Sequence, residues 1–125
     1  MRTFAMPDPG PVLGALLAGA ALGRPAVVLT EDHLEVRLGL GWRSTVPRAD
    51  IVAAGHDPRH PISIGAHGWR GDWLVNTSGH GLVRIDLDPP GRGRVFGVPV
   101  RLRTLRLSLA DPDAFLAALG APSGR

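Results

Sequence analysis

The chain has 125 residues, of which 44% are hydrophobic and 20% charged, which fits one globular domain and excludes a disordered, charge-driven chain. It contains no cysteine, so disulfide scaffolds, thiolate metal sites and thiol nucleophiles are excluded. Its 17 glycines and 12 prolines favour short elements joined by turns over long helices.

The positive charge is unevenly distributed along the chain. All 14 basic residues are arginine, a bias that we interpret as the codon usage of a GC-rich genome. The formal net charge is +3, but residues 1–88 sum to −1 and residues 89–125 to +4. The basic excess is therefore local, and it disfavours the interpretation of the whole chain as a nucleic-acid-binding protein.

The amino-terminal segment, residues 1–25, contains an apolar run from Val12 to Leu22 that ends at Gly23-Arg24-Pro25. As a helix this run would extend about 16 Å, which is too short for the ~30 Å hydrocarbon core of a bilayer. The prolines between Pro7 and Pro11 interrupt the place where a secretory signal would run smoothly into its apolar region. We therefore predict a buried helix over 12–22 in a cytoplasmic protein.

From Ala26 onward the hydrophobic period changes to two. Leu34, Val36 and Leu38 alternate with polar or small residues, the pattern of a strand with one buried face. The strands predicted in this half of the chain cover 26–30, 34–40, 43–46 and 51–54, which together make a meander.

The middle of the chain is less regular. Residues 55–71 predict a long connection with a short strand at 62–64. A strand over 73–76, a hairpin turn at 77–81 and a strand over 82–88 follow. Pro89 to Gly93 should end that strand.

The last strand contains a change of parity. Val100 and Leu102 lie on one face of a regular strand, but Leu105 and Leu107 lie on the other, so we predict a bulge or bend near Arg103 to Leu105. Asp111 then predicts an N-cap for a helix over 111–119 that ends at Gly120. One face of this helix is apolar and must dock on the sheet, and we expect residues 121–125 to be a disordered tail.

This order of elements, six or seven antiparallel strands followed by one helix, resembles the bacterial pleckstrin-homology-like (PH-like) domain over residues 26–120. The segments that carry the resemblance are Val28-Leu29-Thr30, Leu34-Glu35-Val36, Val46-Pro47 with Asp50-Ile51, and residues 108–116. The resemblance implies a strongly bent antiparallel sheet or barrel, mainly β, closed by the carboxy-terminal helix. It also implies a binding module and not an enzyme. The arginines of the first hairpin are diluted by acidic residues, so the resemblance does not extend to phosphoinositide binding.

Three groups of side chains are candidate sites. His56 and His60 have the spacing of a helical zinc pair, but Pro58 disfavours a helix there, and we predict exposed loop histidines and no metal or other cofactor. Trp69, Arg70 and Trp73 form the densest cluster of large side chains. They make either a binding surface or, as we prefer, an interior plug in which both tryptophans share one strand face and Arg70 pairs with Asp72 outside.

The third candidate is basic. Arg101 and Arg103 share one strand face and would form a cationic ridge toward an anionic ligand, an acidic partner or a membrane surface. The alternative that we prefer is an outer face neutralised by Asp86 and Asp88 on the neighbouring strand.

We therefore predict a non-catalytic PH-like module that binds a protein partner or self-associates through a sheet edge or the barrel mouth. The first alternative is a carrier of a small ligand or anionic lipid that uses the barrel interior. The second is a metal-dependent hydrolase on the His56–His60 loop.

Overall fold

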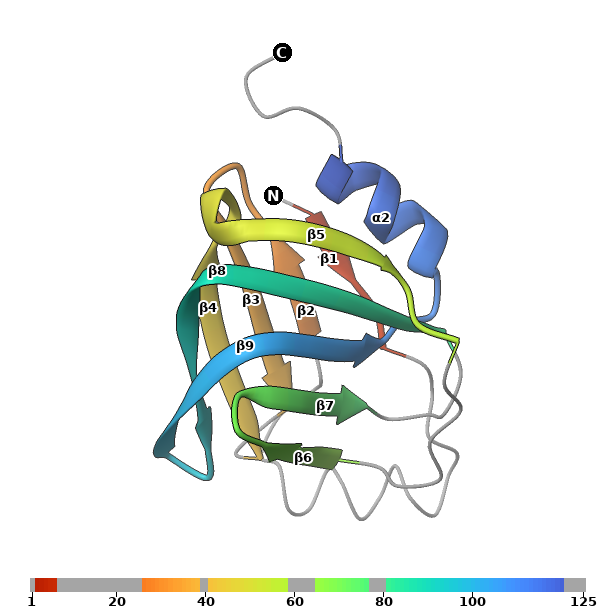
Figure 1. The fold of residues 1–125 in the computed structure, drawn as a ribbon. Helices are drawn as coiled ribbons and strands as arrows, with labels where there is room; N and C mark the ends of the chain where they lie inside the picture. Colours follow the sequence, from red (N-terminus) through yellow and green to blue (C-terminus); the bar gives the residue numbers. More distant parts are fainter. Residues whose placement is uncertain (1, 7–25, 39–40, 59–64, 77–80, 121–125) are drawn as a thin grey trace, which may run out of the picture.

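The computed structural model describes residues 2–6, 26–38, 41–58, 65–76 and 81–120. These residues form one sheet of nine strands, a 3₁₀ turn and one α-helix (Figure 1). The strands are β1 (Arg2–Phe4), β2 (Ala26–Leu29), β3 (His33–Leu38), β4 (Trp42–Pro47), β5 (Ile51–His56), β6 (Gly65–Trp69), β7 (Asp72–Asn76), β8 (Leu82–Val95) and β9 (Val98–Ser108). The 3₁₀ turn is η1 (Arg48–Asp50), and the helix is α2 (Pro112–Gly120). The mainly β class is confirmed.

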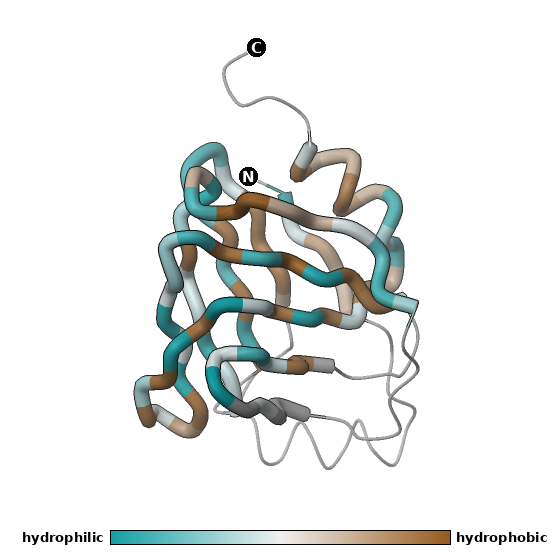
Figure 2. The backbone as a smooth tube through the Cα atoms, in the orientation of Figure 1, coloured by the Kyte–Doolittle hydropathy of each residue, from teal (hydrophilic) through white to brown (hydrophobic). Residues whose placement is uncertain are grey.

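The fourth strand of the predicted meander, β5, pairs with β8 and not with β4, but the first three strands, β2–β3–β4, are confirmed. Both pairings are antiparallel, and the buried residues of β3 are the alternate ones, Leu34, Val36 and Leu38. Figure 2 shows the same alternation of hydrophobic and hydrophilic residues along the strands. The sequence pattern does not predict β1, which pairs antiparallel with β2 and thereby joins the amino-terminal residues to the sheet.

A corner in the sheet lies where the sequence predicts a bulge. The register between β8 and β9 shifts between Asp86 and Gly91, and the amides of Arg103 and Thr104 both donate to the carbonyl of Gly71. Two successive amides on one carbonyl are typical of a β-bulge, and they let Leu102 and Leu105 both face the core. The expected break at residues 89–93 is wrong, because β8 bends there and continues to Val95.

The corner divides the sheet into two halves that fold over one core. The first half of β8 pairs with β5 and its second half with β4, both antiparallel and along the same edge, while β9 borders β8 throughout. β4, η1 and β5 therefore run one after another along β8 (Figure 1). Trp42 from one half and Trp73 from the other meet inside, with ring centroids 5.2 Å apart.

The middle of the chain differs from the prediction. Residues 65–69 are strand β6 and not connection, and Arg70-Gly71 turns it back antiparallel onto β7, with both turn residues at positive φ. β7 does not form the expected hairpin with β8, because β9 lies between them. β7 runs parallel to β9, so the sheet is not wholly antiparallel.

The carboxy-terminal helix begins as predicted. Asp111 Oδ1 accepts the amide of Ala114 at 3.1 Å, which is an N-cap bond. Phe115 is fully buried and meets the Phe4 ring edge-on at 5.2 Å, so α2 covers one end of the bent sheet beside β1 and β5 (Figure 1).

Some predicted elements lie outside the described residues: the helix over 12–22, the strand at 62–64 and the tail 121–125. Over the described residues, the strand order runs from β1 to β6 with no pairing between these two ends, so the sheet is open and closure into a barrel is not shown. No helix in this part of the chain is long and apolar enough to cross a membrane.

Candidate functional site

The tryptophan–arginine cluster of the sequence is divided between two strands. Trp69 ends β6 and Trp73 lies in β7, so the two do not share one strand as expected. The side chain of Trp69 lies outside the described residues. Asp72 contacts the guanidinium of Arg106 from β9, a contact that the sequence does not predict.

Trp73 has a packing role. Its indole lies across Gly68 of β6, where an added Cβ would come within 2.5 Å of the ring. Its Nε1–H donates to the carbonyl of Arg101 at 3.1 Å, and its ring contacts the core at Trp42. These contacts join β6, β7 and β9, and they leave the indole half-buried at the rim of the core.

The histidine candidates do not assemble a metal site in the part of the chain that the structure describes. There, no group of three or more histidine, aspartate or glutamate side chains is placed to hold a metal ion. His56 Nε2 lies 2.7 Å from Asp113 Oδ1, a contact that connects the end of β5 to the first turn of α2. His60 lies outside the described residues.

Arg101 and Arg103 are exposed on the outer side of β9, as predicted, but their neighbours differ from the expectation. Arg92 lies directly opposite Arg101, and Arg94 of the same strand lies opposite Arg43 of β4. Of the two carboxylates expected to neutralise them, Asp86 lies opposite Thr104 and accepts hydrogen bonds from Thr104 and Arg84 instead. Register thus gathers four arginines, Arg43, Arg92, Arg94 and Arg101, on the outside of β4, β8 and β9. We call them the arginine face.

A second surface of interest is the outer edge of β5. Among the described residues, β5 pairs only with β8, and its other edge faces a hollow of about 250 Å³ beside α2. Val52 is 63% exposed, and Ala53 and Ala54 are exposed as well. The hollow is lined by Ile51, Val52, Ala53, Ala54, Leu116, Leu119 and Gly120. It is an apolar surface with unpaired backbone beside it.

The direction of the β5 amides follows from one hydrogen bond. The amide of Asp57 donates to the carbonyl of Leu82 at 2.9 Å, and Gly55 lies opposite Arg84 two residues earlier. Because hydrogen-bonded pairs alternate in an antiparallel ladder, Gly55 directs its amide to β8 while Ala54 and His56 direct theirs away. Ala54 therefore presents a donor at the open edge.

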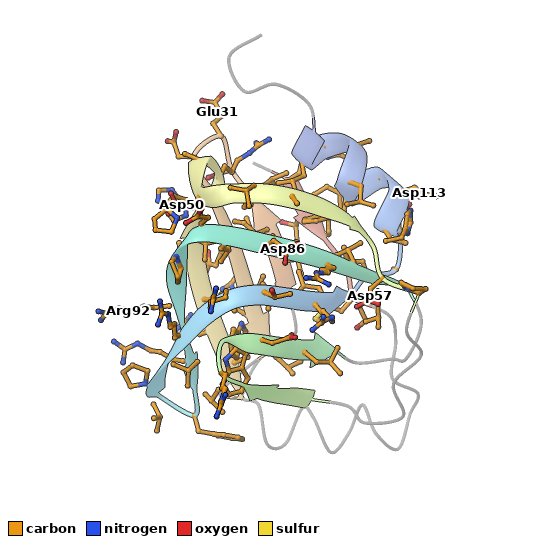
Figure 3. All side chains as sticks on the ribbon, viewed as in Figure 1. Glu31, Asp50, Asp57, Asp86, Arg92 and Asp113 are labelled. Atoms are coloured by element: carbon orange, nitrogen blue, oxygen red, sulfur yellow. The ribbon has the colours of Figure 1, made fainter. Side chains whose placement is uncertain are left out.

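The sequence does not predict a buried cluster of charged side chains around Arg106. The side chain of Arg106 is only 7% exposed, and its Nε lies 2.8 Å from Asp57 Oδ2 while Nη1 contacts Asp72. The side chain of Asp57 is 4% exposed and that of Asp72 is 49% exposed. Figure 3 shows Asp57 beyond the end of β5, on the side of the sheet where β8 and β9 run. The cluster ties the end of β5 to β7 and β9.

The chain matches no protein-family model, no curated protein and no solved structure.

Proposed function

We propose that the protein is a non-catalytic binding module that takes an extended segment of a partner protein as an added strand on β5. The open edge of β5 beside the apolar hollow carries this proposal. An exposed edge is a template for pairing unless proline, charge or a covering element protects it. The residues from Ile51 to Gly55 supply neither proline nor charge.

The chemistry of the edge specifies the partner segment. Its backbone must be extended, so that it can accept the Ala54 amide and its neighbours, and alternate side chains must be apolar to fill the hollow against Leu116 and Leu119. Ala53, Ala54 and Gly55 are small, and an added Cβ at Gly55 would meet no heavy atom within 4 Å, so another backbone can approach closely. The groove thus favours a strand with an apolar stripe.

The bent, mainly β sheet with a docked carboxy-terminal helix also supports the assignment to the PH-like class, which stays a proposal. A bacterial origin and a cytoplasmic location likewise stay predictions. The carrier alternative gains no support, because large side chains such as Trp42, Leu34, Ile85 and Phe115 fill the space between the two halves of the sheet. The hydrolase alternative has no assembled group among the described residues to support it.

A library of random peptides displayed on phage tests the proposal, with the full chain as bait. We expect the selected peptides to share alternating apolar positions and to bind Ala54→Pro much more weakly. Proline removes the outward donor without breaking the ladder to β8, and edge strands tolerate proline at such positions. Ala54→Ser, which retains the amide, is the matched control and should bind as the parent does.

Two further measurements keep this test decisive. Circular dichroism should show the same fold for both variants, and protection of the Ala54 amide from hydrogen exchange should rise when a selected peptide binds. Selected peptides that bind Ala54→Pro unchanged, or a selection that yields none, would refute strand addition. A dimer in light scattering that Ala54→Pro dissociates would make a second copy of this chain the occupant of the edge.

A further inference from the structure

The arginine face concentrates positive charge on a small part of the sheet. Three of its arginines, Arg92, Arg94 and Arg101, lie within residues 89–103, which contain no acidic residue. Cross-strand register then adds Arg43 from a distant part of the chain, opposite Arg94. Figure 3 shows Arg92 at the outer margin of the bent sheet, pointing away from it.

The neighbours of these side chains do not neutralise them. The pairs Arg43–Arg94 and Arg92–Arg101 are directly opposed, and like charges in that position destabilise a sheet. Glu35, which lies opposite Thr45, is 3.3 Å from Arg37, and Arg37 is itself opposite Arg43. In the described part of the chain, no salt bridge is seen for the four arginines of the face. An anion bound among them would offset the repulsion.

Two hollows lie side by side on this face and share Arg92 and Pro99. One, of about 300 Å³, is bordered by Arg43, Arg92 and Arg94 together with Thr45. The other, of about 430 Å³, is bordered by Arg92 and Arg101. Gly91 and Gly93 alternate with these arginines and face the core, where an added Cβ would meet Val46 and Trp42, so Arg92 and Arg94 both point to the outside of β8.

We propose that the arginine face is a binding site for a ligand that carries two or more closely spaced phosphate groups. Guanidinium groups bind phosphate through paired, charge-assisted hydrogen bonds, and Arg92 can contribute to both hollows. Strands lie about 4.8 Å apart, so anions in adjacent hollows are close enough to belong to one molecule. This site is separate from the β5 edge, and neither proposal depends on the other.

The ligand can be free in solution or can be the headgroup of a lipid, and the tip of the β8–β9 hairpin distinguishes these sources. Phe96 is 71% exposed and Val98 62% exposed, beside the arginine face. Apolar side chains next to a basic patch add affinity at a bilayer surface but contribute nothing to a small soluble anion. Phe96→Ser should therefore weaken binding only when the phosphate belongs to a membrane.

The test is calorimetric titration of the full chain with inorganic phosphate, pyrophosphate and tripolyphosphate at low salt. We expect affinity to rise about tenfold or more from phosphate to tripolyphosphate, and Arg92→Gln to weaken tripolyphosphate binding about tenfold, because one arginine serves both hollows. Arg84→Gln is the matched control: Arg84 is also an exposed strand arginine, but it pairs with Asp86, and its loss should change affinity less than about twofold.

Two comparisons decide the chemistry and the source. Tricarballylate, with three carboxylates, should bind more weakly than tripolyphosphate; equal affinity would overturn the phosphate assignment and leave a general polyanion surface. Co-sedimentation with phosphatidylcholine vesicles, with and without phosphatidic acid, is then measured for the parent and Phe96→Ser. If Phe96→Ser weakens binding to the vesicles but not to tripolyphosphate, the ligand is a lipid headgroup. If Phe96→Ser weakens neither, the ligand is free in solution. No binding of tripolyphosphate, or binding unchanged by Arg92→Gln, overturns the site.

Discussion

Replacing Arg106 by methionine should destabilise the protein far more than replacing any exposed arginine. The guanidinium is buried with the carboxylate of Asp57, whose side chain is 4% exposed, and it also contacts the half-exposed Asp72. Methionine keeps much of the apolar stem but leaves Asp57 buried without this cation. Asp72 retains its hydration and should contribute little.

The expected magnitude follows from this difference in burial. Removing one partner of a buried ion pair costs about 3–5 kcal/mol, because the remaining charge stays desolvated. That is a large share of the roughly 5–15 kcal/mol by which a domain of this kind is stable. Arg84 supplies the contrast, since its pair with Asp86 is exposed to solvent and Arg84→Met should cost less than about 1 kcal/mol.

A double variant separates charge burial from packing. In Arg106→Met/Asp57→Leu no buried charge remains at this pair, and apolar replacement of a buried ion pair is often neutral or stabilising. We therefore expect it to recover at least about 2 kcal/mol of the loss in the single variant. Urea unfolding followed by tryptophan fluorescence measures both, because Trp42 lies in the core. A single variant within about 1 kcal/mol of the parent, or a double variant no more stable than the single, would show that this ion pair does not hold β5, β7 and β9 together.

Three further substitutions test the packing of the fold by the same urea assay. Gly93→Ala should lower the free energy of unfolding by about 1–3 kcal/mol, because the added Cβ would lie 2.6 Å from the buried ring of Trp42. Gly55→Ala, whose Cβ would meet no heavy atom within 4 Å, should be near neutral. Equal losses in the two variants would contradict the steric argument. Phe115→Ala should cost about 3–5 kcal/mol, because its fully buried ring anchors α2, and a smaller loss would mean that the helix docks without it. Asp111→Ala should cost about 1 kcal/mol through loss of the N-cap bond, whereas Asp111→Asn should cost much less.

The sequence predicts those features of the fold that depend on neighbours in the chain. Alternating Leu34, Val36 and Leu38 predict β3, and Asp111 with Pro112 predicts the start of α2. The corner is also predictable, because the parity of buried residues changes between Leu102 and Leu105 and only a bulge can reconcile the two sets.

Features that depend on distant pairing are not predictable in this way. Arg103 and Arg106 look alike in the sequence, yet Arg103 is exposed and Arg106 is buried. Only Arg106 meets Asp57, which follows β5, and Asp72 of β7. The parallel pairing of β7 with β9 has no local signal, so the punctuation at 77–81 predicts a hairpin that does not form. The arginine face is not predictable for the same reason, because Arg43 is far from Arg94 in the sequence.

The corner in the sheet is the common origin of both proposed surfaces. β4 and β5 follow one another along a single edge of β8. Between the pairs Ser44–Gly93 and Ile51–Leu87, β8 pairs with neither strand. β4 and β5 thus occupy successive lengths of the same edge, and β4 does not cover the outer edge of β5. The same bend carries the second half of β8 to β4, which brings Arg43 beside Arg94. The open edge therefore lies beside the first half of β8 and the gathered arginines lie on its second half, so the two surfaces are on either side of one corner although each can be altered alone.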